Sequence, residues 1–306
     1  MKIKRSNSYG HVLMLLAIIL AASSFPIGAM ITNELSPEIM MFLRFFIASL
    51  MFLPFVIIKY GFSIPSRTMF YNYILLSIPL VTFFWCMFES LRYTSILNTG
   101  SLYTLVPAIT AVCAFIVNRE LTGRWCVFGL ILGTIGALWI VFRGDLNLFA
   151  GLELNYGDLV FLAGCLSLGL YNPLVKRFYM GEPIIVMTFW ILFSGSALLL
   201  FVSITNIAQV DWVSIESNVY FGIVYLSLFS TLITFLIINY STVRIGATKV
   251  AAYGFLTPLF VISMSILVGI ESFDMVTLPG MLLIMVAMIF ILRDDSQITK
   301  AIKSDI

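Results

Sequence analysis

Few residues of this chain have types and spacings that suit an active site or a metal centre. The single histidine, His11, excludes any site that needs two imidazoles. The four cysteines, Cys86, Cys113, Cys126 and Cys165, each lie in an apolar run and form no CxxC pair, which is typical of buried small hydrophobic residues. No carboxylate lies deep in an apolar run. We therefore expect no catalytic residue, no metal site and no cofactor.

Arg44 is the one formal charge well inside an apolar segment. If that segment crosses a membrane, its charge marks a functional candidate that faces the other helices. The planar guanidinium suits a carboxylate, so Arg44 is a candidate counter-ion for a bound carboxylate. The alternative, which we favour on the sequence, is structural: a fixed ion pair with Glu38 or Glu89, or an extended side chain that reaches the headgroups.

Two tyrosines form the next group of candidates. Tyr103 and Tyr253 precede Pro107 and Pro258 by four or five residues, about one helical turn, so each tyrosine lies on the same side of its helix as its proline. This placement favours a shared cavity. Most aromatic residues of a membrane chain serve in packing or at the interfaces, and that interpretation remains open for both.

Four further side chains are weaker cavity candidates. Tyr171 and Asn172 directly precede Pro173, and Trp85 and Ser24 lie within apolar segments. The alternative for the aromatic residues is packing, and the alternative for Ser24 is a hydrogen bond to a carbonyl of its own helix.

The composition requires that most of this chain is surrounded by lipid. Of its 306 residues, 61% are apolar and only 10% are charged, against about 25% in soluble domains. The net charge of +2 is too small to indicate nucleic acid. A membrane crossing needs about 20 apolar residues, and only helices satisfy the backbone of so many embedded segments. The charge-poor windows predict ten transmembrane helices: 6–33, 37–58, 68–88, 93–118, 125–142, 159–175, 183–210, 217–243, 250–270 and 275–292.

The basic residues predict the orientation of these spans. With both termini in the cytoplasm, every Lys and Arg except Arg44, Arg92 and Arg143 falls in a cytoplasmic segment. Such a bias is typical of membrane proteins. The first window begins like a signal peptide, but it is too long for one and we expect it to be retained as the first span.

The chain repeats itself in outline. Residues 105–120 and 256–271 share Leu, Pro and Glu at matching positions, and Pro26 and Pro107 match Pro173 and Pro258 at nearly constant offsets. Residues 1–145 and 152–292 are therefore predicted to be two five-helix repeats, followed by a cytoplasmic tail at 293–306. Five is odd, so the second copy is inverted, an arrangement known from transporters with a midplane site. We expect a kink or break at each of these four prolines.

Several stretches resemble one family. Phe25–Pro26, Arg44–Phe45, SLRYTSILNTGSLYTLVPAITAV (90–112), GDLVFLAGCLSLGLY (157–171) and GATKVAAYGFLTPLFVISMSILVGIE (246–271) resemble, in order and spacing, the drug/metabolite transporter superfamily, and specifically its EamA-type ten-helix transporters. Leu168 stands where this family usually has tryptophan, and the first span also lacks the usual tryptophan.

The resemblance implies a secondary transporter of a bacterial cytoplasmic membrane. Its substrate would be a small metabolite, most readily an amino acid or a related compound, moved outward by alternating access. Uptake of a nucleotide-like metabolite is the alternative, and an intramembrane enzyme fits less well. The expected partners are the substrate and the lipid bilayer, without nucleic acid. Gly129, Gly133 and Gly136 favour close helix packing, and the spans at 125–142 and 275–292 offer a surface for a homodimer.

Overall fold

A computed structural model describes residues 2–24, 27, 31, 34–61, 64–90, 92–94, 96–145, 147, 155–267 and 275–293. Within these residues all regular structure is helical and no β-strand occurs, so the prediction of an all-α chain is confirmed for them. Pro26 and Glu271 lie outside the described residues, and so does most of the tail predicted at 293–306.

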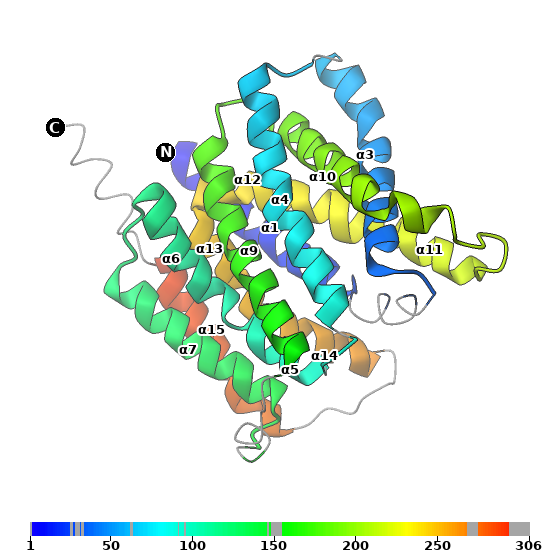
Figure 1. Ribbon diagram of the computed structural model, residues 1–306. Coiled ribbons are helices and arrows are strands. Elements are labelled where there is room, and N and C mark those ends of the chain that lie inside the picture. Colours follow the sequence, from blue (N-terminus) through cyan, green and yellow to red (C-terminus); the bar gives the residue numbers. More distant parts are fainter. Residues whose placement is uncertain are drawn as a thin grey trace.

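The helices form one bundle (Figure 1). In chain order they are α1 (Lys2–Ala22), α3 (Pro37–Tyr60), α4 (Arg67–Ser90), α5 (Ile96–Tyr103), α6 (Val106–Asn118), α7 (Arg124–Val141), α9 (Tyr156–Phe178), α10 (Ile184–Ile207), α11 (Ser217–Tyr225), the π-helix η1 (Leu226–Ile233), α12 (Thr234–Ile245), α13 (Ala247–Ala252), the 3-10 turn η2 (Tyr253–Leu256), α14 (Thr257–Leu267), the 3-10 turn η3 (Met275–Thr277) and α15 (Leu278–Arg293).

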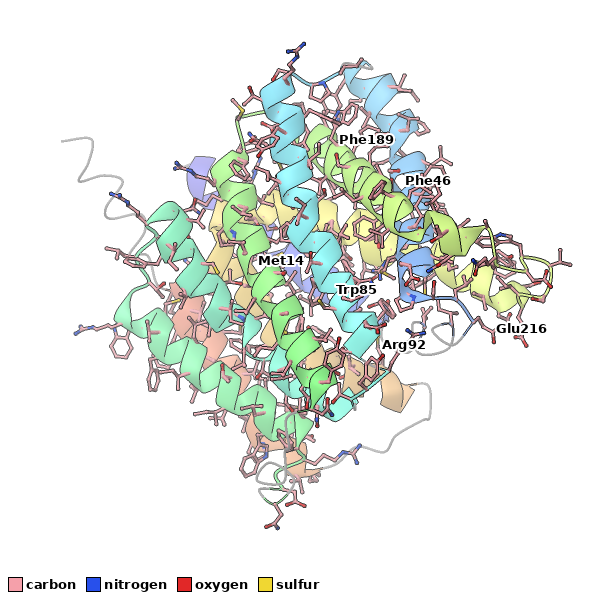
Figure 2. The ribbon with its side chains drawn as sticks, in the orientation of Figure 1. Met14, Phe46, Trp85, Arg92, Phe189 and Glu216 are labelled. Carbon is pink, nitrogen blue, oxygen red and sulfur yellow. The ribbon has the colours of Figure 1, made fainter. Side chains whose placement is uncertain are left out.

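Many of these helices can cross a bilayer. Eight helical stretches among the described residues are long and apolar enough: Pro37–Tyr60, Arg67–Ser90, Asn98–Asn118, Arg124–Val141, Tyr156–Phe178, Ile184–Ile207, Ser217–Ile245 and Met275–Arg293. Two shorter apolar helices, Tyr9–Ala22 and Ala247–Val261, overlap the first and ninth predicted spans. Charged side chains such as Arg92 and Glu216 lie toward the edge of the bundle, while Met14 is buried inside it (Figure 2). The chain is a multi-pass membrane protein, and the count of ten spans stays a prediction.

Helices of the first half pack chiefly on helices of the second half. The most extensive contacts join α7 to α15, α4 to α9 and α3 to α10, and α1 packs along α12. If the two halves are repeats, α1 corresponds to α9 and α4 corresponds to α12. The contact of α4 with α9 is then the counterpart of the contact of α1 with α12. This reciprocal pairing is what two repeats would produce, and their inversion stays a prediction.

The first and last described helices both contact the segment that contains the end of α12 and α13. Ser241 Oγ, near the end of α12, donates a hydrogen bond to the Gly10 carbonyl of α1 at 3.4 Å. Lys249 Nζ, on α13, donates to the Leu292 carbonyl at the end of α15 at 3.2 Å. The start of α1 and the end of α15 therefore lie on the same side of the bundle.

Two of the predicted spans are broken helices. The span at 93–118 is divided between α5 and α6, with a turn at Thr104 and Leu105 directly before Pro107. The span at 250–270 contains the 3-10 turn η2, which ends directly before Thr257 and Pro258. Proline has no backbone N–H to donate, so each helix starts anew where that donor is dispensable. Pro173 differs, because α9 remains helical through it.

Glycines bring α7 and α15 together within one chain. A Cβ atom at Gly136 would lie 2.9 Å from the Gly280 carbonyl oxygen, and one at Gly129 would lie 2.9 Å from the Ala287 carbonyl oxygen. A Cβ atom at Gly133 would lie 2.7 Å from the Phe255 ring. The small-residue face that the sequence offered as a dimer surface is thus covered by the chain's own helices. A homodimer through other surfaces stays a prediction.

Gly136→Ala tests this close approach. The new methyl group would press on the backbone of α15, and we expect a loss of about 1–3 kcal/mol of stability, as overpacking usually costs. Melting of the purified protein in detergent, followed by size-exclusion fluorescence, measures the effect. Gly100→Ala is the matched control, because its Cβ atom would meet only Val141 side-chain atoms at 3.7 Å. Equal melting of the two variants would contradict the close packing of α7 and α15.

Candidate functional site

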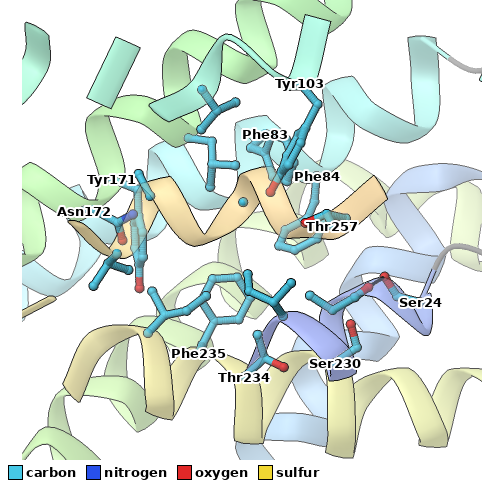
Figure 3. Close-up of a pocket in the computed structure, with 18 of the residues that line it drawn as sticks. Ser24, Phe83, Phe84, Tyr103, Tyr171, Asn172, Ser230, Thr234, Phe235 and Thr257 are labelled. Atoms are coloured by element: carbon cyan, nitrogen blue, oxygen red, sulfur yellow. Dashed lines mark hydrogen bonds between the residues drawn. The ribbon is translucent and has the colours of Figure 1, made fainter. Parts of the chain in front are cut away.

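An internal cavity of about 110 Å³ lies between the two halves of the chain (Figure 3). One water molecule needs about 10–15 Å³ of such space, so the cavity holds several waters or part of a small solute. Residues of α1, α3, α4, α5 and α6 line it from the first half, and residues of α9, η1, α12, α13, η2 and α14 line it from the second half.

The cavity wall is mostly apolar. Three phenylalanines, Phe83, Phe84 and Phe235, face it together with aliphatic residues. Its few polar groups come from separate helices: Ser24, Arg44, Tyr103, Tyr171, Asn172, Ser230, Thr234 and Thr257. An apolar wall with a few fixed polar groups is the usual construction of a site for a small molecule.

Arg44 of α3 lies at the boundary between the cavity and η1. Its side chain is 1% exposed. Its Nε donates a hydrogen bond to Thr231 Oγ1, and its Nη2 donates to the Ser230 carbonyl at 3.3 Å and to Ser230 Oγ at 3.1 Å. The guanidinium carbon lies 4.7 Å from the centre of the Phe84 ring, a cation–π contact. Arg44 therefore joins α3 of the first half to η1 of the second half.

The ion pair considered for Arg44 on the sequence is wrong. Glu38 accepts a hydrogen bond from Asn206 Nδ2 at 2.8 Å. Glu89 pairs with Arg92 at 3.1 Å. Neither carboxylate meets Arg44, because Glu38 lies at the first turn of α3 and Glu89 near the last residue of α4, whereas Arg44 points into the bundle.

The segment that receives Arg44 is a π-helix, a rare form that is frequent at functional sites. Thr234 Oγ1 donates to the Phe229 carbonyl at 2.9 Å, five residues back. Sequence reasoning missed Ser230 and Thr231. Their signal was present, because Ser227, Ser230, Thr231 and Thr234 recur at helical spacing within an otherwise apolar span.

Tyr171 and Asn172 lie at the cavity wall and are held by hydrogen bonds. Tyr171 Oη donates to Asn239 Oδ1 at 2.8 Å, and Asn239 Nδ2 donates to Thr188 Oγ1 at 3.0 Å. Thr242 Oγ1 donates to Asn172 Oδ1 at 3.4 Å. These bonds join α9 to α10 and α12, so this side of the cavity is rigid.

Tyr103, by contrast, offers a hydroxyl to the cavity. It is the last residue of α5, directly before the break, and it lines the cavity close to Gly254. No hydrogen bond is recorded for its hydroxyl within the described residues. Across the cavity, Thr257 is the first residue of α14. The two helix breaks therefore place Tyr103 and Thr257 at the same cavity (Figure 3).

The other predicted residues are placed as follows. Ser24 lines the cavity, but its hydroxyl donates to the Ala21 carbonyl at 2.6 Å, which is the back-bonding alternative. Tyr253 is buried and bonds His11 Nδ1 at 2.9 Å, just outside the cavity that its neighbour Gly254 lines. Trp85 is 37% exposed and does not line the cavity. The substrate-binding role of every one of these residues stays a prediction.

Near Pro173 the two halves are joined at the ends of α6 and α9. Asn118 Nδ2 donates to the Pro173 carbonyl at 3.0 Å. Glu120 Oε1 lies 2.5 Å from Lys176 Nζ. The Glu120 carboxylate is buried and pairs with the last turn of α9.

An apolar helical bundle with a cavity between its two halves is an arrangement common among membrane transporters. The EamA-like transporter family model matches residues 8–142 and 155–293. The chain belongs to this family, and the resemblance drawn from its motifs is confirmed.

Relatives and a solved structure agree with this assignment. The chain is 26% identical to "Uncharacterized transporter YyaM" of Bacillus subtilis (strain 168) over 85% of its length and 86% of the relative. It is 25% identical to an "Uncharacterized transporter" of Archaeoglobus fulgidus over 83% of its length and 87% of the relative. A crystal structure that is 15% identical shares the fold, with a TM-score of 0.74 over 92% of this chain and 96% of that one.

Tyr103→Phe and Trp85→Phe separate the cavity from the outer surface. Removal of the Tyr103 hydroxyl takes away a polar group of the cavity, and we expect about a 5- to 10-fold loss of affinity for a bound solute, the size of one hydrogen bond. Trp85→Phe changes only an outward side chain and should leave affinity unchanged. Ligand-induced thermal shifts of both variants measure this. A larger loss in Trp85→Phe would contradict the assigned cavity.

Proposed function

We propose that this protein is a secondary transporter that moves a small metabolite, an amino acid or a related compound, out of the cell by alternating access. The cavity is the observation that most directly supports this proposal, because residues of both family-matching stretches, 8–142 and 155–293, line it. A solute bound there would contact both halves, so relative movement of the halves changes access to it. Sites at the interface of two repeats are common in transporters.

The helix breaks support movement of the cavity wall. At Pro107 and Pro258 the backbone turns without a continuous α-helical ladder. Half-helices at such breaks are a recurring element of transporter sites. We propose that α6 and α14 move relative to α5 and α13, respectively.

The volume of the cavity and the side chains that line it favour a small, partly apolar solute. The phenylalanines suit an apolar side chain, and the few polar groups suit the charged end of an amino acid or a similar metabolite. The sequence has no P-loop motif, so ATP would not drive transport directly. We place the protein in a bacterial cytoplasmic membrane, in agreement with its relative from Bacillus subtilis.

Counterflow in liposomes tests the transport proposal. Purified protein is reconstituted, the vesicles are loaded with an unlabelled amino acid mixture, and uptake of one labelled amino acid is followed. We expect transient accumulation well above that of protein-free vesicles, because a carrier exchanges solute in both directions. The same assay with nucleosides tests the alternative substrate class. Absence of counterflow for every probe would overturn the proposal.

Transport direction is tested in cells. We expect cells that express the protein to release a labelled dipeptide-derived amino acid faster than cells with the empty vector. Faster accumulation of external amino acid without faster release would instead show uptake.

The proposed orientation, with both termini in the cytoplasm, has its own test. A green fluorescent protein fused after Ile306 should fluoresce, and alkaline phosphatase at the same position should be inactive, because the reporters fold on opposite sides of the membrane. The reverse result would contradict the predicted orientation.

A further inference from the structure

Within the described part of the chain, the positive charge of Arg44 has no negative partner at the cavity. Its side chain is 1% exposed and lines the cavity wall. Arg92 pairs with Glu89 and Lys176 pairs with Glu120 among the described residues, and neither ion pair involves Arg44. Its hydrogen bonds go to two hydroxyl groups and one carbonyl, all of them neutral. Among the residues that the structure describes, no aspartate or glutamate lines the cavity.

A buried cation without a counter-ion is unfavourable, because neutral dipoles replace only part of its hydration. Such residues inside membrane proteins usually face cavities and mark the path of a substrate or an ion. An anion that enters the cavity would supply the missing charge. The cavity would therefore favour anionic groups over neutral or cationic ones of the same shape.

The geometry leaves part of the guanidinium available. Phe84 covers one face of the group, and Nε and Nη2 are directed toward Thr231 and Ser230. Nη1 makes no hydrogen bond within the part of the chain that the structure describes. An incoming oxygen atom therefore approaches in the guanidinium plane on the Nη1 side, where a carboxylate or phosphate forms charge-assisted hydrogen bonds.

The rest of the cavity fits the remainder of such a solute. Phe83 and Phe235 line the cavity (Figure 3), and both rings pack against Phe84, which covers one face of Arg44. The polar atoms of Asn172 and Tyr103 lie on other helices of the lining. A solute with an anionic group at Arg44 and an apolar group between the phenylalanine rings would fit both the charge and the apolar wall.

We propose that Arg44 binds an anionic group of the transported solute, a carboxylate or a phosphate, and so determines that the substrate is an acid. This inference rests on the proposed transport function. In this proposal Arg44 determines substrate specificity and is not only structural. The hydrogen bonds of Arg44 to η1 hold the guanidinium in position.

Matched pairs of probes test it on the wild-type protein. Thermal shift and competition against counterflow are measured with L-leucine and L-leucinamide, and with glycerol 3-phosphate and glycerol. The amide keeps the size and the ammonium group of the amino acid but lacks the anion. We expect the anionic member of at least one pair to bind at least about 10-fold more tightly, as expected for a charge-assisted hydrogen bond. The pair that discriminates identifies carboxylate or phosphate as the natural head group.

Variants locate the effect at Arg44. Arg44→Gln should abolish the discrimination between acid and amide, and Arg44→Lys should retain part of it, because the charge remains but the planar fork is lost. Arg67→Gln is the matched control, since Arg67 is exposed at the start of α4. If Arg44→Gln fails to fold, Thr231→Val serves instead. It removes one bond that orients the guanidinium and should weaken the acid without affecting the amide.

The outcomes separate this inference from the transport proposal. Equal binding of acid and amide in both pairs, or discrimination that survives in Arg44→Gln, overturns the anion site even if counterflow occurs. Acid-selective thermal shifts without any counterflow support the anion site and overturn the transport proposal. Counterflow of neutral or cationic solutes alone supports transport and overturns the role of Arg44.

Discussion

The contact of Arg44 with Ser230 and Thr231 is the interaction on which the rest of the structure depends. Arg44 is a charged side chain buried among apolar helices, and its hydrogen bonds join a helix of one half to the π-helix of the other. The apolar surroundings strengthen each of its hydrogen bonds and make its unbalanced charge costly. The cavity lies beside this contact, and both Arg44 and Ser230 line it.

Much of the architecture could be predicted from the sequence, because lipid as a solvent leaves few solutions. A charge-poor run of sufficient length has to be a helix, so the predicted spans and the helices agree closely along α3, α4, α7 and α10. The paired prolines also carried information. Pro107 and Pro258 lie at broken helices because proline removes a backbone donor in any context.

The candidate site could be predicted only in part, because the sequence does not say which face of a helix looks inward. Tyr103, Tyr171, Asn172, Ser24 and Arg44 line the cavity, whereas Trp85 on α4 faces outward. In a chain this apolar, both faces of each helix are hydrophobic, and amphipathicity gives no direction. The partners of Arg44 were missed for another reason. Ser230 and Thr231 share a polar face with Ser227 and Thr234 at helical spacing, but the sequence does not show that this face meets Arg44 or that the segment is a π-helix.

That register has a mechanical consequence. A π-helix bonds to the fifth residue rather than the fourth, so it stores one extra residue relative to an α-helix. Return of η1 to α-helical bonding would turn everything that follows it by about 100°, one residue's share of a 3.6-residue turn. Phe235 and Asn239 lie within the first two turns of α12, directly beyond η1. Such a change in the backbone bonds of η1, beside Arg44, would rotate Phe235 of the cavity wall and break the hydrogen bond between Asn239 and Tyr171.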